Sequence, residues 1–198
     1  MNSKRYLTIL AAAVVLAASA VMAGPGEKYT SDATHSTVEF SVKHMMITNV
    51  KGTFDTFDAV IMFEPGDLDH ASVEVSIDVA SVNTRDEKRD EHLRSPDFFD
   101  AAKFPTITFK SSKISKKGDG YVAAGALTIR GVSKEVEIPF QLNGPITNPW
   151  GQVVMGIELD YKINRKDFGV NWDKTMDNGG LVVSDDVKIE INLEAKKS

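Results

Sequence analysis

The stretch VKIEINL at residues 187–193 alternates apolar and polar side chains at every position. Successive side chains of a β-strand point to opposite faces of the sheet, so this pattern predicts a strand with one buried and one solvated face. The same period of two recurs at residues 38–42, 73–79, 138–142 and 157–163. The chain is therefore predicted to be all-β.

Turn residues such as Pro65-Gly66, Gly118-Asp119-Gly120 and Asn143-Gly144-Pro145 separate the predicted strands. Short connections indicate antiparallel hairpins, because parallel strands need long crossovers. Periodicity alone leaves a sandwich and a closed eight-stranded barrel open. We place eight strands near residues 35–48, 50–63, 71–79, 104–114, 120–129, 132–142, 152–163 and 184–195.

Two connections between the predicted strands do not show this alternation of apolar and polar residues. The connection 81–103 contains a charged run from Arg85 to Arg94 without Gly or Pro, which predicts one short helix that ends before Pro96. Residues 164–183 are rich in Asn, Asp and Gly, which predicts a long irregular loop.

The N-terminus has the pattern of a secretory signal peptide. Lys4 and Arg5 precede an uncharged apolar run from Leu7 to Ala20, and Val21 and Ala23 suit a signal peptidase. The alternative is an uncleaved anchor, but the run is shorter than the ~20 residues that span a bilayer. We predict cleavage after residue 23 and a single β domain over residues 24–198, with no stable membrane insertion.

Composition excludes several classes of function. The chain has no cysteine, which rules out thiol catalysis and cysteine-ligated metals. Its net charge of −5 becomes −7 when Lys4 and Arg5 are removed, so nucleic acid is not an expected partner. The four histidines lack metal-pair spacing and no hydrolase or nucleotide-binding motif occurs, so we predict no metal, no cofactor and no catalytic residue.

The ten phenylalanines, all in the mature domain, have two possible structural roles. They either fill an ordinary core or line an apolar cavity, as ligand pockets are largely apolar and aromatic. The segment from Arg89 to Asp100 has a similar ambiguity. Arg89 and His92 share one helical face and precede Phe98 and Phe99, which fits either a solvated surface helix or the mouth of a barrel.

Six motifs in order resemble the YceI-like family of secreted proteins over residues 27–195. They are DxxHSxVxFxVxH at 32–44, VKGxFxxF at 50–57, RDxHLxSxDFFD at 89–100, FPxIxFxS at 104–111, GxLTIxGV at 125–132 and NRxDFGV at 164–170. The resemblance implies a lipocalin-like antiparallel barrel whose apolar tunnel binds a polyisoprenoid lipid or an isoprenoid quinone. It also implies that the protein forms a homodimer, as members of the family often do.

Under this resemblance we predict a periplasmic lipid carrier rather than an enzyme; the alternative is a hydrolase or a metal-assisted enzyme acting on an apolar exported substrate. The polar candidates for the lipid head group are His44, Arg89 and His92. The predicted tunnel residues are Phe40, Val42, Met45, Phe54, Phe57, Phe98, Phe99, Phe109, Leu127, Ile129, Phe168 and Trp172.

Overall fold

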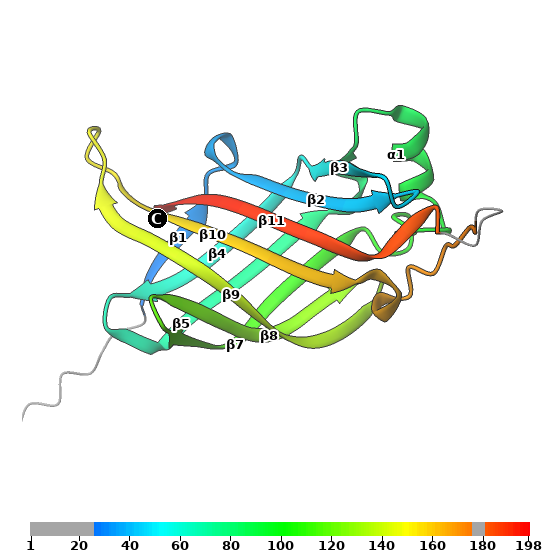
Figure 1. The fold of residues 1–198 in the computed structure, drawn as a ribbon. Helices are drawn as coiled ribbons and strands as arrows, with labels where there is room; N and C mark the ends of the chain where they lie inside the picture. The colour runs from blue at the N-terminus through cyan, green and yellow to red at the C-terminus, as the bar shows by residue number, and fades with distance from the viewer. Residues whose placement is uncertain (1–25, 176–180) are drawn as a thin grey trace, which may run out of the picture.

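A computed structural model describes residues 26–175 and 181–198 and confirms the antiparallel barrel (Figure 1). Eight strands form a ring in the order β1-β4-β5-β7-β8-β9-β10-β11, and pairing between β1 and β11 closes it. The strands are β1 (Glu27–Ser31), β2 (Thr37–His44), β3 (Thr48–Phe54), β4 (Phe57–Glu64), β5 (Asp67–Asp78), β6 (Val82–Asn83), β7 (Thr106–Lys117), β8 (Gly120–Ile129), β9 (Val132–Thr147), β10 (Val153–Asn164) and β11 (Val183–Lys197).

Two of the barrel strands are each built from two segments. β1 lies opposite residues 195–197 of β11, and β2 continues along the same edge opposite residues 183–192. β4 and β3 pair with β1 and β2 in the same succession. The 3₁₀ turn η1 (Ala33–His35) interrupts the first composite strand, and two residues interrupt the second. With β1 and β2 counted as one strand and β3 and β4 as another, the barrel has eight strands, which correspond to the eight predicted strands.

The predicted strand boundaries need two corrections. The expected strand 50–63 is broken at Asp55, whose carboxylate accepts hydrogen bonds from Thr53 Oγ1 at 2.7 Å and Asn83 Nδ2 at 2.9 Å. Such local side-chain bonds compete with the sheet ladder. β1 was not predicted, because Tyr29 is its only large apolar residue and one residue shows no alternation.

The predicted helix is present as α1 (Glu87–Arg94). Asp86 caps it by accepting a hydrogen bond from the Arg89 backbone N–H at 3.0 Å, and Ser95 ends it one residue before Pro96. The predicted loop 164–183 begins with an ordered 3₁₀ turn, η3 (Arg165–Phe168), which ends at Gly169 in the left-handed region with φ of 73°.

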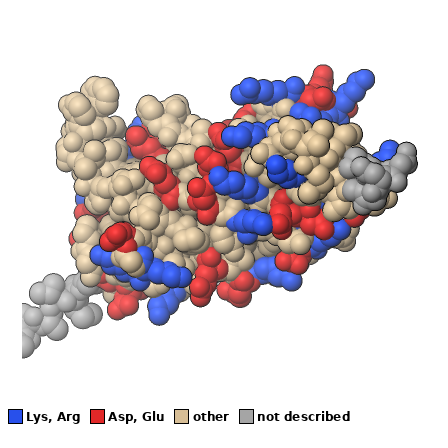
Figure 2. Space-filling view, in the orientation of Figure 1, with Lys and Arg blue, Asp and Glu red and all other residues tan. Residues whose placement is uncertain are grey.

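The two ends of the barrel differ. At the hairpin end, where β9 and β10 join, Tyr29, Met155 and Ala195 fill the interior and are at most 1% exposed. At the helix end lie α1, the β2–β3 turn (residues 45–47) and the segments 169–175 and 181–183 (Figure 1). Acidic and basic side chains are mixed over the body of the molecule (Figure 2).

The predicted signal peptide at residues 1–23 lies outside the described residues, so cleavage stays a prediction. Within residues 26–175 and 181–198, no helix is long and apolar enough to cross a membrane.

Candidate functional site

The interior of the barrel contains a cavity of about 420 Å³, partly open to solvent. Its walls are the inward-facing members of the alternating strands, such as Ile157 and Leu159 of β10 and Ile189 and Ile191 of β11. The volume lies in the range of small-molecule pockets, and the lining is overwhelmingly aliphatic and aromatic. The cavity extends to the helix end, because α1 and residues 182–183 contribute to its lining.

The structure brings nearly all of the predicted tunnel residues to this cavity. Met45 is the exception: it lies in the β2–β3 turn with φ of 50° and is 41% exposed. The predicted residues that line the cavity are Phe40, Val42, Phe54, Phe57, Phe98, Phe99, Phe109, Leu127, Ile129, Phe168 and Trp172.

Much of the cavity wall comes from residues that the sequence analysis used only to define strands. The sequence did contain a signal for them, because these apolar positions alternate with polar residues along β10 and β11, as inward-facing residues do. These additional residues on β10 and β11 include Ile157, Leu159, Tyr161, Ile163, Val187, Ile189, Ile191 and Leu193.

Aromatic rings cluster at the helix end of the cavity. The ring centroids of Phe98 and Trp172 are 5.2 Å apart. The imidazole of His92 stands edge-on to both rings, at 5.0 Å from Phe98 and 5.6 Å from Trp172. This arrangement offers flat apolar surfaces beside a polar ring nitrogen.

The three predicted head-group residues, His44, Arg89 and His92, all line the cavity at this end. Arg89 also makes hydrogen bonds within the protein: its Nε donates to Thr84 Oγ1 and its Nη2 donates to the Thr84 carbonyl, each at 2.7 Å. The Thr84 N–H in turn donates to the buried carboxylate of Asp90 at 2.8 Å. Arg89 therefore also fixes the segment that leads into α1.

Arg165 is a buried residue that the sequence analysis missed, because an arginine in a polar loop is normally solvated. It is 5% exposed, and its Nη1 donates to the carbonyls of Val170 at 2.8 Å and Trp172 at 2.7 Å. Its Nη2 reaches Asp185 Oδ1 at 3.0 Å. Arg165 therefore holds the segment that places Trp172 over the cavity.

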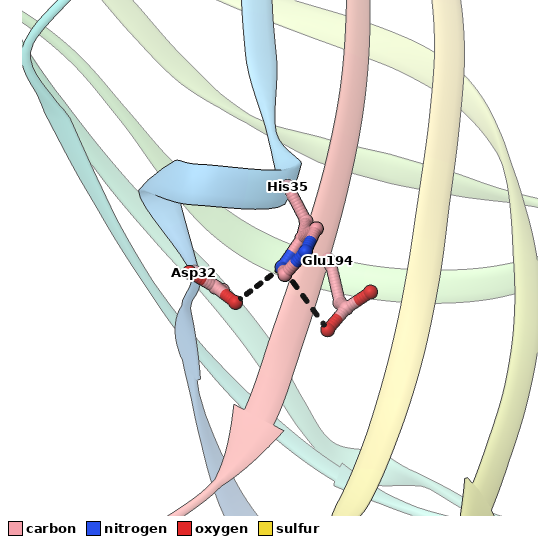
Figure 3. Close-up of side chains that lie close together, drawn as sticks. All are labelled: Asp32, His35 and Glu194. Atoms are coloured by element: carbon pink, nitrogen blue, oxygen red, sulfur yellow. Dashed lines mark hydrogen bonds and ion pairs between the residues drawn. The ribbon is translucent and has the colours of Figure 1, made fainter. Parts of the chain in front are cut away.

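A second polar cluster lies outside the cavity lining (Figure 3). His35 Nδ1 is 2.7 Å from Asp32 Oδ2 and 3.9 Å from Glu194 Oε1. Among the described residues these three form the one His and carboxylate group compact enough to share a metal ion. However, Lys196 Nζ already lies 2.6 Å from Asp32 Oδ2. Hydrogen bonds from Lys196, His35 and Thr34 hold the pKa of Asp32 well below its usual range.

Known proteins share this barrel. The Campylobacter jejuni YceI protein superimposes with a TM-score of 0.67 and 36% identity, covering 79% of this chain and 90% of that one. Burkholderia cenocepacia BcnA gives a TM-score of 0.71 at 28% identity, covering 83% and 98%. A polyisoprenoid binding domain from Saccharophagus degradans gives 0.63 at 16% identity, covering 86% and 98%, which bears on the fold alone.

Sequence comparison agrees with the fold. The UPF0312 protein SAS2572 of Staphylococcus aureus is 36% identical over 167 residues, covering 84% of this chain and 95% of the relative. The family model described as the YceI-like domain matches residues 29–195, which is nearly the whole barrel from β1 to β11. The chain therefore belongs to the YceI-like family.

Proposed function

We propose that this protein is a periplasmic carrier that binds a lipid with an isoprenoid tail inside the barrel. The observation that carries the proposal is the apolar cavity of about 420 Å³, whose few polar residues include His44, Arg89 and His92 at one end. The neighbour from Saccharophagus degradans is a polyisoprenoid binding domain of the same fold, which supports a ligand of this class. Export by the predicted signal peptide would deliver the carrier to the periplasm.

The energetics favour a long tail. Each buried CH₂ group contributes about 0.8 kcal/mol, so a tail of fifteen carbon atoms gains about 12 kcal/mol before costs. Association costs about 4–15 kcal/mol in lost freedom and ordering. Because the two terms are comparable, a tail of three isoprene units is near the lower limit for useful affinity, and longer tails bind better until the cavity is full.

The head group belongs at the helix end in this proposal. His44 and Arg89 supply hydrogen-bond donors there, His92 offers Nδ1 because its Nε2 lies 2.9 Å from Asp97 Oδ2, and Phe98 and Trp172 supply flat surfaces for a ring. A quinone would use the rings and the donors, and a polyprenyl phosphate would use the donors and the positive charge of Arg89. The shared chemistry is the isoprenoid tail, and the two head groups are compared in the experiment.

The role is passive binding rather than catalysis. Among the described residues that line the cavity, the only aliphatic hydroxyl is that of Thr84, which donates to Asp90 Oδ1 and accepts from Arg89 Nε. A nucleophile would need a free base at this oxygen instead. A hydrolase remains the alternative that the experiment addresses by assaying turnover of ester and glycoside substrates.

The test is native mass spectrometry of the protein purified without added lipid, followed by organic extraction and lipid analysis. We expect an isoprenoid species, and uptake of ubiquinone or undecaprenyl phosphate by protein stripped of lipid. Val187→Trp, which fills the cavity, should weaken uptake, while Lys188→Trp on the opposite face of β11 serves as the control. An empty protein that takes up neither probe would overturn the proposal.

The head-group role has its own variants. Arg89→Ala and His92→Ala should change the preference between ubiquinone and undecaprenyl phosphate, while Lys88→Ala, on the same helix but outside the cavity lining, should not. If affinity and preference are unchanged in both cavity variants, the head group does not sit at the helix end.

A further inference from the structure

The β2–β3 turn presents three consecutive apolar side chains to solvent. Met45, Met46 and Ile47 are 41%, 57% and 81% exposed. Met45 and Met46 have φ values of 50° and 61°, in a region that residues other than glycine rarely adopt. Three adjoining exposed apolar residues are unusual for a solvated turn, where polar residues dominate.

This turn adjoins the cavity. His44, the residue before it, lines the cavity and pairs with Val183, which also lines it. The Met45 N–H donates to the carbonyl of Val182, another lining residue, at 2.9 Å. The three exposed residues Met45–Ile47, here called the apolar tip, are therefore joined by backbone hydrogen bonds to the helix end of the cavity, and the two form one continuous region.

The charge of the hairpin differs from that of the whole chain. Residues 40–54, the part of the hairpin nearest the turn, contain Lys43 and Lys51 but no Asp or Glu, and the one acidic residue of the hairpin, Glu39, lies on β2 farther from the turn; the chain as a whole has a net charge of −5. Both lysines are exposed and flank the apolar tip on the two strands of the hairpin. Lysines beside an apolar tip suit the anionic head groups of a lipid surface.

A rival apolar surface lies at the hairpin end of the barrel. Ile146 and Trp150 near the β9–β10 connection are 62% and 83% exposed, and Figure 2 shows this projection without charged side chains at its tip. Residues 136–161 contain no Lys or Arg. The rival surface therefore lacks charge complementarity to anionic lipid, and the filled hairpin end separates it from the cavity.

We propose that the turn Met45–Ile47 docks reversibly on an anionic bilayer surface, so that the helix end faces the membrane while a lipid tail enters or leaves. This inference rests on the proposed lipid-carrier function and adds the partner surface. The apolar side chains enter the boundary between head groups and acyl chains, and Lys43 and Lys51 stay at the level of the head groups. The overall negative charge of the protein keeps the contact weak, so the carrier can leave.

The experiment compares wild type, the double variant Met46→Ser/Ile47→Ser and the control Ile146→Ser in sedimentation with phosphatidylcholine vesicles that contain phosphatidylglycerol. We expect wild type and the control to bind, and binding to weaken with added salt. The double variant should bind at least about tenfold more weakly. Equal binding by the double variant and wild type, or no binding by wild type, would overturn the docking proposal.

A second measurement separates this proposal from the carrier function. Ubiquinone is supplied either from ethanol or from the same vesicles. The double variant should match wild type in affinity when ethanol delivers the probe and should load several-fold more slowly from vesicles. Failure of wild type by both routes counts against the carrier function itself. If the double substitution instead converts a dimer into a monomer in light scattering, the turn packs on a second copy and the docking proposal is wrong.

Discussion

The ring of Phe40 on β2 lies against the backbone of Gly52 on β3, so close that a Cβ at Gly52 would come within 2.5 Å of Phe40 Cζ. The same Cβ would lie 2.7 Å from Thr84 Cγ2, so it has no room on the other side. Phe40 lines the cavity, and because residue 52 is a glycine, the Phe40 ring can pack against the backbone of β3.

Gly52→Ala should therefore push the Phe40 ring into the cavity. Overpacking of this kind costs about 1–3 kcal/mol in the free energy of unfolding, which urea denaturation measures. Affinity for the isoprenoid probe should fall as well. Gly156→Ala is the matched control, because its Cβ would meet only Asn143 Cβ at an ordinary 3.7 Å. Similar losses in both variants would mean that the Phe40 contact is not the cause.

The two tryptophans provide a built-in sensor. Trp172 lines the cavity, whereas Trp150 is 83% exposed and outside the lining. In Trp150→Phe, a bound lipid should exclude water from Trp172 and shift its fluorescence to shorter wavelength. In Trp172→Phe, the remaining signal from Trp150 should not respond. A response from Trp150 alone would place the lipid elsewhere.

Arg165→Ala should destabilise the protein strongly. It removes the guanidinium that donates to the carbonyls of Val170 and Trp172 and leaves Asp185 with Lys166 as its remaining ionic partner. Loss of one partner from a buried pair costs about 3–5 kcal/mol, and we expect about 3 kcal/mol, most of it from the two carbonyls, because the Asp185 side chain is 29% exposed and keeps Lys166.

Lys162→Ala is the control for Arg165, because it breaks the exposed pair with Asp186 at 2.6 Å and should cost less than about 1 kcal/mol. Arg165→Lys should recover only part of the loss, since an ammonium cannot reproduce the planar fork of the guanidinium. Equal unfolding midpoints for the Arg165 variants and wild type would contradict the structural role.

The Asp32 cluster predicts a dependence of stability on pH. Hydrogen bonds from Lys196, His35 and Thr34 lower the pKa of Asp32 in the folded chain. An Asp whose folded pKa is lowered contributes stability above its unfolded pKa of about 3.9, and the contribution is lost as pH falls through the folded value.

Asp32→Asn should therefore destabilise the protein at neutral pH, and its difference from wild type should shrink below about pH 4. Urea unfolding at several pH values measures this difference. Asp119→Asn, in the exposed turn between β7 and β8, should give a small difference at every pH. A constant difference for Asp32→Asn across the acid range would show that its charge is not involved.

Structural features that depend on one local sequence pattern could be predicted correctly. Alternation along residues 187–193 predicts both a strand and its inward face, so the eight barrel strands followed and, apart from Met45, the predicted tunnel residues line the cavity, although many other lining residues were not assigned to it. Features that depend on contacts between residues distant in sequence could not be predicted in this way. The burial of Arg165 depends in part on the carbonyl of Ser184 and the carboxylate of Asp185, and the break at Asp55 depends on Asn83. Tyr29 became recognisable as a core residue only once β1 was paired with β4 and β11.

The closing contact of the barrel joins Tyr29 to Lys197, across almost the whole length of the domain. During synthesis the cavity has no continuous wall until β11 has emerged, so the cavity is complete only after β11 has paired with β1. Contacts so distant in sequence form slowly. Until they form, β1 and β11 both expose unpaired edges that can join other chains. The interval before closure is thus the stage at which the nascent protein is most exposed to aggregation and to proteolysis.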